Sequence, residues 1–94
     1  MITLVKAVQL RALAGHRLWV RFSDGSEGVR SFADIIAEGG VMVEPLRDQA
    51  FFEQAFIAFG VPTWPNGFDV DAINLRVDIE NNGGLSRPKV ALDA

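Results

Sequence analysis

The side chains that most often perform catalysis or bind metals are scarce in this sequence. His16 is the only histidine among the 94 residues, and the chain contains no cysteine. Zinc sites are built from several cysteine and histidine ligands, and a nucleophilic dyad needs a base beside its serine or cysteine. His16 lies in a predicted turn, so we interpret it as a solvated loop residue rather than as a ligand or a base.

The acidic residues near the end of the chain partly match a calcium-binding loop. Asp69, Asp71 and Glu80 have the spacing of the first, third and twelfth ligands of such a loop. The pattern fails in its middle, because Ile73 occupies a ligand position and Asn74 replaces the glycine of the turn. Asp71 is better interpreted as the cap of a helix.

Other catalytic patterns are equally incomplete. Asp24 could join Asp69 or Asp71 in a carboxylate pair for acid–base chemistry, but each of the three has a turn or cap role. No serine lies in a Gly-x-Ser-x-Gly elbow, and the two Gly-Gly pairs lack the Lys-Ser or Lys-Thr of a phosphate-binding loop. We therefore predict that the chain is not an enzyme and that it binds no metal or cofactor.

Alternating apolar and polar residues predict three strands at the start of the chain. The first covers residues 2–13, and a break at residues 14–17 separates it from a second alternating segment, residues 18–22. Asp24 and Gly25 follow, and an Asp-Gly pair between alternating segments is typical of a two-residue type I′ turn, because both of its residues need positive φ. We predict an antiparallel meander of three strands.

This turn determines which side chains share a face of the sheet. It pairs Val20 with Val29 and Trp19 with Arg30. The buried face then comprises Ile2, Leu4, Val8 and Leu10 of the first strand, with Leu18, Val20, Phe22 and Val29. The opposite face carries Trp19, Arg21 and Arg30, and we expect Trp19 to stack on Arg30 in a cation–π contact.

Short helices are predicted after the meander. Ser31 is the expected N-cap of the first helix, which ends at Gly39 and Gly40. Pro45 predicts an extended connector over residues 41–46, since proline is excluded from central strands and helix interiors.

Two aspartates predict the remaining helices. Asp48 can cap a second short helix, and Asp71 can cap a third that runs to about Val77. Ile73 and Val77 are four residues apart and therefore share one apolar face of that helix.

The predicted fold class is α+β, with an antiparallel sheet covered on one side by short helices. The N-terminal meander is followed by the helices and by a second pair of strands, at residues 55–59 and 61–64. We expect one domain over residues 1–80 and a flexible C-terminal tail over residues 81–94.

Two surfaces are candidates for binding a partner. Trp19, Arg21 and Arg30 form an aromatic–arginine cluster of the kind enriched at interfaces, unless helices cover Trp19. Trp64 and Asn66 lie in a turn that either docks a partner or fixes the loop to the core through the indole ring.

Composition narrows the class of partner. The chain is 49% hydrophobic and 22% charged, with a net charge of −3, which suits a single globular domain and argues against nucleic-acid binding by the chain on its own. The sequence shows neither a signal peptide nor an apolar run long enough to span a membrane. We expect a cytoplasmic protein that does not act at a membrane.

Several motifs resemble a small bacterial family known as domain of unknown function 2442. They are Leu18-x-Val20-x-Phe22-Ser23-Asp24-Gly25, then Pro45-Leu46 with Phe52, then the string from Gly60 to Asp69 with Leu75. The resemblance covers residues 3–78, and its most specific part is Trp-Pro-Asn-Gly-x-Asp at residues 64–69. It implies a compact α+β domain, sometimes followed by a helix-turn-helix, for which the segment after Asn82 is too short. It also implies a gene pair of a toxin–antitoxin-like kind. No catalytic residues are established for the family, so the resemblance assigns none to this chain.

Together these observations favour a non-catalytic protein-interaction module whose partner is another protein or a second copy of the chain in a homodimer. The alternative is a DNA-associated regulatory component that binds through Arg17, Arg21 and Arg30 or with the help of a partner.

Overall fold

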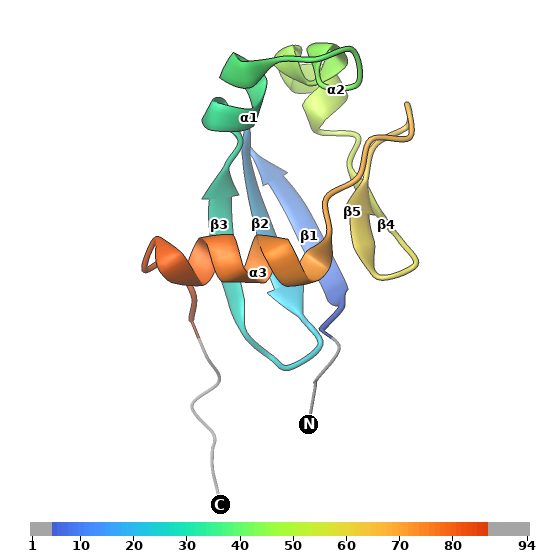
Figure 1. Cartoon of the computed structure of the whole chain (residues 1–94). Coiled ribbons are helices and arrows are strands. Elements are labelled where there is room, and N and C mark those ends of the chain that lie inside the picture. Colours follow the sequence, from blue (N-terminus) through green and yellow to red (C-terminus); the bar gives the residue numbers. More distant parts are fainter. Residues whose placement is uncertain (1–4, 87–94) are drawn as a thin grey trace, which may run out of the picture.

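A computed structural model of the chain describes residues 5–86 and confirms the α+β class. Strands β1 (Ala7–Leu13), β2 (Arg17–Phe22) and β3 (Glu27–Ser31) form an antiparallel sheet in the order β1-β2-β3. Helix α3 (Ala72–Asn81) crosses one face of this sheet, and the shorter helices gather at one of its ends (Figure 1). A two-stranded sheet lies beside β1.

The turn between β2 and β3 is one residue longer than predicted. The N–H of Phe22 donates to the carbonyl of Ser26 at 2.8 Å, which closes a three-residue loop ending in Gly25 at φ +88°. The carboxylate of Asp24 accepts hydrogen bonds from both the N–H and the hydroxyl of Ser26, at 3.0 and 2.6 Å, and so stabilises the longer loop.

This extra residue shifts the register of β3 by one position. Trp19 lies opposite Val29, and Leu18 lies opposite Arg30. A one-residue shift exchanges the two faces of a strand. The predicted placement of Val29 in the core and of Arg30 beside Trp19 is therefore wrong.

A β-bulge alters the start of β1 in a similar way. Ala7 pairs with Phe22, whereas Gln9 pairs with Arg21, so Val8 is the extra residue. Ala7 is buried and Val8 is 50% exposed, which contradicts the prediction that Val8 faces the core.

Helix α3 covers the apolar face of the sheet. Its N-cap is Asp71, whose carboxylate accepts a hydrogen bond from the N–H of Asn74 at 2.9 Å, as predicted. Leu75 and Ile79 are buried, and α3 continues well beyond the predicted end. The pair Ile73 and Val77, which the sequence placed on a packed face, is instead more than 40% exposed, because the sheet contacts the opposite side of the helix.

The helical end of the molecule contains α1 (Ala33–Glu38), the 3-10 helix η1 (Glu44–Arg47) and α2 (Gln49–Phe52). The predicted cap at Asp48 is confirmed, since its carboxylate accepts from the N–H of Ala50. Ser31 is not the N-cap of α1, which is Phe32, although its hydroxyl accepts a hydrogen bond from the N–H of Ala33. The predicted extended connector is wrong in part. Pro45 lies in the first turn of η1, where its missing N–H costs no hydrogen bond.

The second strand pair is confirmed as β4 (Phe56–Ala58) and β5 (Val61–Thr63). The segment after α3 differs from the expected tail. Ser86 exchanges two backbone hydrogen bonds with Glu27 of β3, at 2.9 and 2.7 Å, and Leu85 packs against the core. The rest of the predicted tail, residues 87–94, lies outside the described residues. Within residues 5–86, no helix has the length and apolar character to cross a bilayer.

Candidate functional site

The two residues predicted in the Trp-Pro-Asn-Gly turn are structural. The Trp64 side chain is fully buried, and its indole N–H donates to the carbonyl of Phe52 at 2.9 Å. Asn66 donates to the carbonyl of Met42 at 2.9 Å and accepts from the N–H of Phe68 at 3.2 Å. Trp64 therefore cannot contact a partner, and Asn66 is occupied in holding the loop to the chain.

Trp19 lies on the face of the sheet that α3 does not cover. We call this surface the open face. It comprises Gln9, Arg11 and Leu13 of β1, Arg17, Trp19 and Arg21 of β2, and Glu27, Val29 and Ser31 of β3. Most of these side chains are exposed, and no other described element packs over them (Figure 1).

Trp19 occupies the middle of the open face. Its cross-strand neighbours are Arg11 on β1 and Val29 on β3. The guanidinium carbon of Arg21 lies 5.7 Å from the centre of the indole ring, within the range of a cation–π contact. Arg21 is also held by Glu27, at 3.0 Å. Trp19 and Arg21 thus share a face of the sheet, as predicted, and the arginine that stacks on the indole ring is Arg21.

A shallow hollow of about 290 Å³ opens beside the indole ring. Its walls are Arg11, Leu13 and Trp19. An aromatic ring, an aliphatic side chain and a guanidinium group surround the same space. This set of groups suits an inserted apolar or aromatic side chain better than it suits a small polar substrate.

Arg30, the third member of the predicted cluster, is elsewhere. Its guanidinium contacts Asp34 of α1 at 3.1 Å and Asp78 of α3 at 3.4 Å, and it lies 5.5 Å from the ring centre of Phe32. Only 14% of the side chain is exposed. Because of the register shift, Arg30 joins β3 to the helices, and the expected stack on Trp19 does not form.

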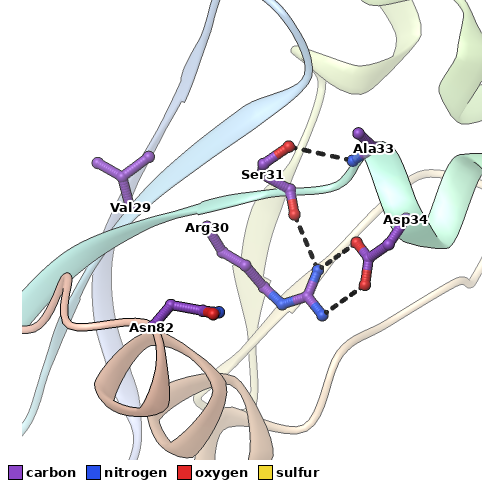
Figure 2. A pocket seen from close by; sticks show the side chains of 6 residues that line it. All are labelled: Val29, Arg30, Ser31, Ala33, Asp34 and Asn82. Atoms are coloured by element: carbon purple, nitrogen blue, oxygen red, sulfur yellow. Dashed lines mark hydrogen bonds and ion pairs between the residues drawn. The ribbon is translucent and has the colours of Figure 1, made fainter.

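A pocket lies beside Arg30 (Figure 2). The volume of this pocket is about 480 Å³. Its lining includes Val29, Arg30, Ser31, Ala33, Asp34 and Asn82. Hydrogen bonds from Arg30 lower the pKa of Asp34, so the carboxylate stays ionised near neutral pH. Two carboxylates neutralise this arginine, so the pocket has no spare positive charge for an anion.

Hydrogen bonds and an ion pair join the β2–β3 turn to α3. Arg76 donates to the carboxylate of Asp24 at 3.0 Å and to the hydroxyl of Ser26, which is buried, at 3.2 Å. Burial acts to raise the pKa of Asp24, but the hydrogen bonds from Ser26 and the charge of Arg76 outweigh it, and the pKa is lowered. An ionised Asp24 cannot serve as a general acid, and its contacts make it structural.

His16 differs from the predicted solvated residue. Its Nε2 lies 2.9 Å from the carbonyl oxygen of Arg47, and its ring makes an edge contact with Phe52. The side chain thus ties the β1–β2 turn to the helical end of the molecule. Among the described residues, no group of three or more histidine, cysteine or acidic side chains is arranged to hold a metal ion.

Sequence reasoning missed three residues of the open face. Arg11, Leu13 and Val29 lie around Trp19. The longer β2–β3 turn changed the face of Val29, and the register of β1 against β2, which brings Arg11 and Leu13 to the indole ring, was not predicted. The alternation of Gln9, Arg11 and Leu13 along β1 was the available signal, because the predicted burial of Leu10 already places these three residues on the opposite side of the strand.

Comparison with known proteins identifies a family but no function. A family model described as protein of unknown function (DUF2442) matches residues 7–81, from the first residue of β1 to the last of α3. No curated protein and no solved structure matches the chain significantly.

Proposed function

We propose that this chain, which belongs to the DUF2442 family, is a non-catalytic protein-interaction module that binds its partner on the open face. The observation that carries the proposal is the position of Trp19. A large aromatic side chain lies in the centre of an uncovered sheet face, beside a hollow, with arginines on several sides. Tryptophan and arginine are the residues most enriched among interface hot spots.

The open face also has the layout of an interface. Trp19, Leu13 and Val29 supply an apolar centre, while Arg11, Arg17 and Arg21 lie around it. In protein interfaces such a centre provides most of the affinity, and charged groups at the rim fix orientation and partner choice. The setting that we propose is a cytoplasmic two-gene system of the toxin–antitoxin kind.

A nucleic-acid partner is the second candidate, because arginines around an exposed aromatic ring can hold phosphates and stack a base. The alternative drawn from the sequence is DNA binding through Arg17, Arg21 and Arg30. Arg30 is neutralised by two carboxylates, whereas the other two arginines share the open face with Arg11. The net charge of −3 opposes this alternative. Binding through phosphates must weaken steeply with salt, which separates the two candidates.

The test is the Trp19→Ala variant compared with Val77→Ala, which truncates an exposed apolar side chain on α3. We expect Trp19→Ala to weaken association, either with itself or with a purified partner, by about 1–2 kcal/mol or more. Its circular dichroism and melting temperature should stay close to those of the native chain. Val77→Ala should change neither property. Unchanged association of Trp19→Ala, measured by calorimetry or sedimentation, would refute the proposal.

A further inference from the structure

The tip of the β4–β5 hairpin presents an aromatic side chain to solvent. Phe59 is fully exposed and has φ +52°, and Gly60 beside it has φ +79°. Ala58 and Val61 pair across them, so Phe59 and Gly60 form a two-residue turn in which both residues have positive φ. No described residue covers the phenyl ring.

Folding of the described residues does not explain a phenylalanine at this position. A bulky residue in the left-handed region is strained, and such turns favour Asn, Asp or Gly at the place that Phe59 occupies. A fully exposed phenyl ring also contributes none of the free energy that a phenylalanine gains when it is buried away from water. Both costs would be offset if the ring were buried against another molecule. Strained residues of this kind point to a contact site.

The same chain carries a hollow that fits such a ring. The space beside Trp19, about 290 Å³ in volume, has room for a phenyl side chain. A phenyl ring in it would meet the indole ring of Trp19, the methyl groups of Leu13 and the guanidinium of Arg11. These are favourable neighbours for an aromatic ring. Phe59 does not fill the hollow of its own chain, because it is fully exposed.

The position of the two features along β1 indicates how two copies could meet. The N–H of Ala7 donates to the carbonyl of Gly60 at 2.8 Å, which holds the hairpin tip at the start of β1. The hollow lies at the other end of the strand, at Arg11 and Leu13. Two β1 strands that approach antiparallel bring the start of each beside the end of the other.

The β4–β5 hairpin lies beside β1 and is hydrogen-bonded to it at Ala7, so only the part of the outer edge beyond the hairpin is available for such an approach (Figure 1). β1 is an edge strand of its sheet. Alternation of hydrogen bonds in an antiparallel pair turns the backbone groups of Leu10 and Ala12 away from β2, toward this edge, and no described strand pairs with them there. Unpaired edges of this kind are templates for pairing with another chain.

We propose that two copies of the chain associate about a two-fold axis along their β1 edges, with Phe59 of each copy seated in the hollow formed by Arg11, Leu13 and Trp19 of the other. The inference rests on the proposed function, since it names a second copy as the partner that contacts the open face. Because both contacts repeat under the two-fold axis, the assembly closes as a dimer.

Cysteine cross-linking tests the contact directly, because the native chain has no cysteine. Phe59→Cys and Leu13→Cys variants, one carrying a size tag, are mixed under mild oxidation. We expect a disulfide between the tagged and the untagged chain. Ile73→Cys replaces Phe59→Cys in the control mixture, since Ile73 is an exposed apolar residue on α3, and no heterodimer with Leu13→Cys should accumulate there. Equal cross-linking in both mixtures, or none in either, would overturn the proposal.

A second variant separates loss of the contact from loss of the fold. Asparagine tolerates positive φ, so Phe59→Asn removes the ring and relieves the backbone strain together. We expect a higher melting temperature for the isolated chain, together with dimerisation at least about tenfold weaker by sedimentation. The proposed contact brings Lys6, which lies beside Gly60, toward Arg11 in the hollow of the other copy, and both side chains are basic. Salt screens the repulsion between like charges, so added salt should not weaken the native dimer. Dimerisation unchanged by Phe59→Asn would refute the second-copy inference.

The two proposals fail in different ways. If Phe59→Asn leaves all association unchanged while Trp19→Ala abolishes it, the open face binds a partner that is not a second copy docked through Phe59. If Trp19→Ala leaves all association unchanged, the open face itself is not an interface and the proposed function fails.

Discussion

The two tryptophans of this chain lie in regions that make opposite use of an indole ring. Trp64 is fully buried, with its N–H bonded to a carbonyl and its ring 5.6–5.7 Å from the rings of Phe32, Phe52 and Phe68. Trp19 lies half-buried on the open face with arginine neighbours. The indole ring of Trp64 is completely covered by other side chains of the chain. The indole ring of Trp19 keeps part of its surface exposed to solvent.

Strand β2 shows how one short segment serves both purposes. Its even-numbered residues Leu18, Val20 and Phe22 are at most 1% exposed, while the odd-numbered Arg17, Trp19 and Arg21 face outward. Because side chains alternate along a strand, the two sets can change independently. Stability is therefore concentrated on the covered face of the sheet, and the open face is free to acquire binding residues.

The largest effect expected from this comparison is on folding, at Trp64. Trp64→Ala removes the centre of the aromatic core and should lower the free energy of unfolding by about 3–5 kcal/mol. Trp19→Ala should lower it by less than about 1 kcal/mol, because a half-exposed ring leaves no enclosed cavity. Urea unfolding of both variants checks the contrast. Equal destabilisation would show that Trp19 also belongs to the core.

A smaller effect is expected where α3 crosses the sheet. A Cβ on Gly28 would lie 2.5 Å from Cγ2 of Ile79 and 2.6 Å from the carbonyl oxygen of Gly84. Gly28→Ala should therefore push α3 away from β3 and cost about 1–3 kcal/mol. Gly84→Ala is the matched control, since its Cβ would make only ordinary contacts at 3.8 Å. Thermal melts that rank the two variants equally would contradict the close approach.

The arginines allow the comparison to be repeated with charged residues. Arg30→Ala removes a mostly buried side chain that joins β3 to α1 and α3, and we expect a loss of about 1–2 kcal/mol in stability. Arg21→Ala removes an exposed ion pair and should change stability by no more than about 0.5 kcal/mol. If Arg21→Ala were the more damaging of the two in denaturant unfolding, the open face would have a structural role.

Sequence reasoning found the local features of the fold and missed those set by contacts between distant segments. The caps at Asp48 and Asp71 were predictable because each side chain acts on a backbone group two or three residues away. Whether Ile73 and Val77 or Leu75 and Ile79 faced the sheet was not, because α3 has apolar residues on both sides and its packing partner lies far away in sequence.

For the candidate site, the sequence was informative about residue types and poor about their neighbours. Trp19 and Arg21 share a face in any register, so their association was predictable. The partner on β1 depends on the register of β1 against β2, and the partner on β3 depends on the three-residue turn that Asp24 stabilises. One residue more in the β2–β3 turn replaced Arg30 with Val29 beside the indole ring.

The smallest effect expected is a pH dependence that belongs to the covered side of the molecule. The pKa of Asp24 is lowered in the folded chain despite its burial, because Ser26 and Arg76 stabilise the carboxylate. A lowered folded-state pKa contributes stability above the unfolded-state value of about 4, and this contribution is lost as the pH falls through the folded-state pKa. Asp24→Asn should therefore be less stable than the native chain at pH 7, and the difference should narrow below about pH 4.

Ser26→Ala removes a 2.6 Å hydrogen bond to the same carboxylate. The difference in stability between this variant and the native chain should also narrow as the pH falls. Urea unfolding across this pH range is the measurement. If the free energies of unfolding of Asp24→Asn and the native chain differ by the same amount at every pH, Asp24 has the same pKa in the folded and unfolded chain. The contact between the β2–β3 turn and α3 would then be stabilised by packing rather than by charge.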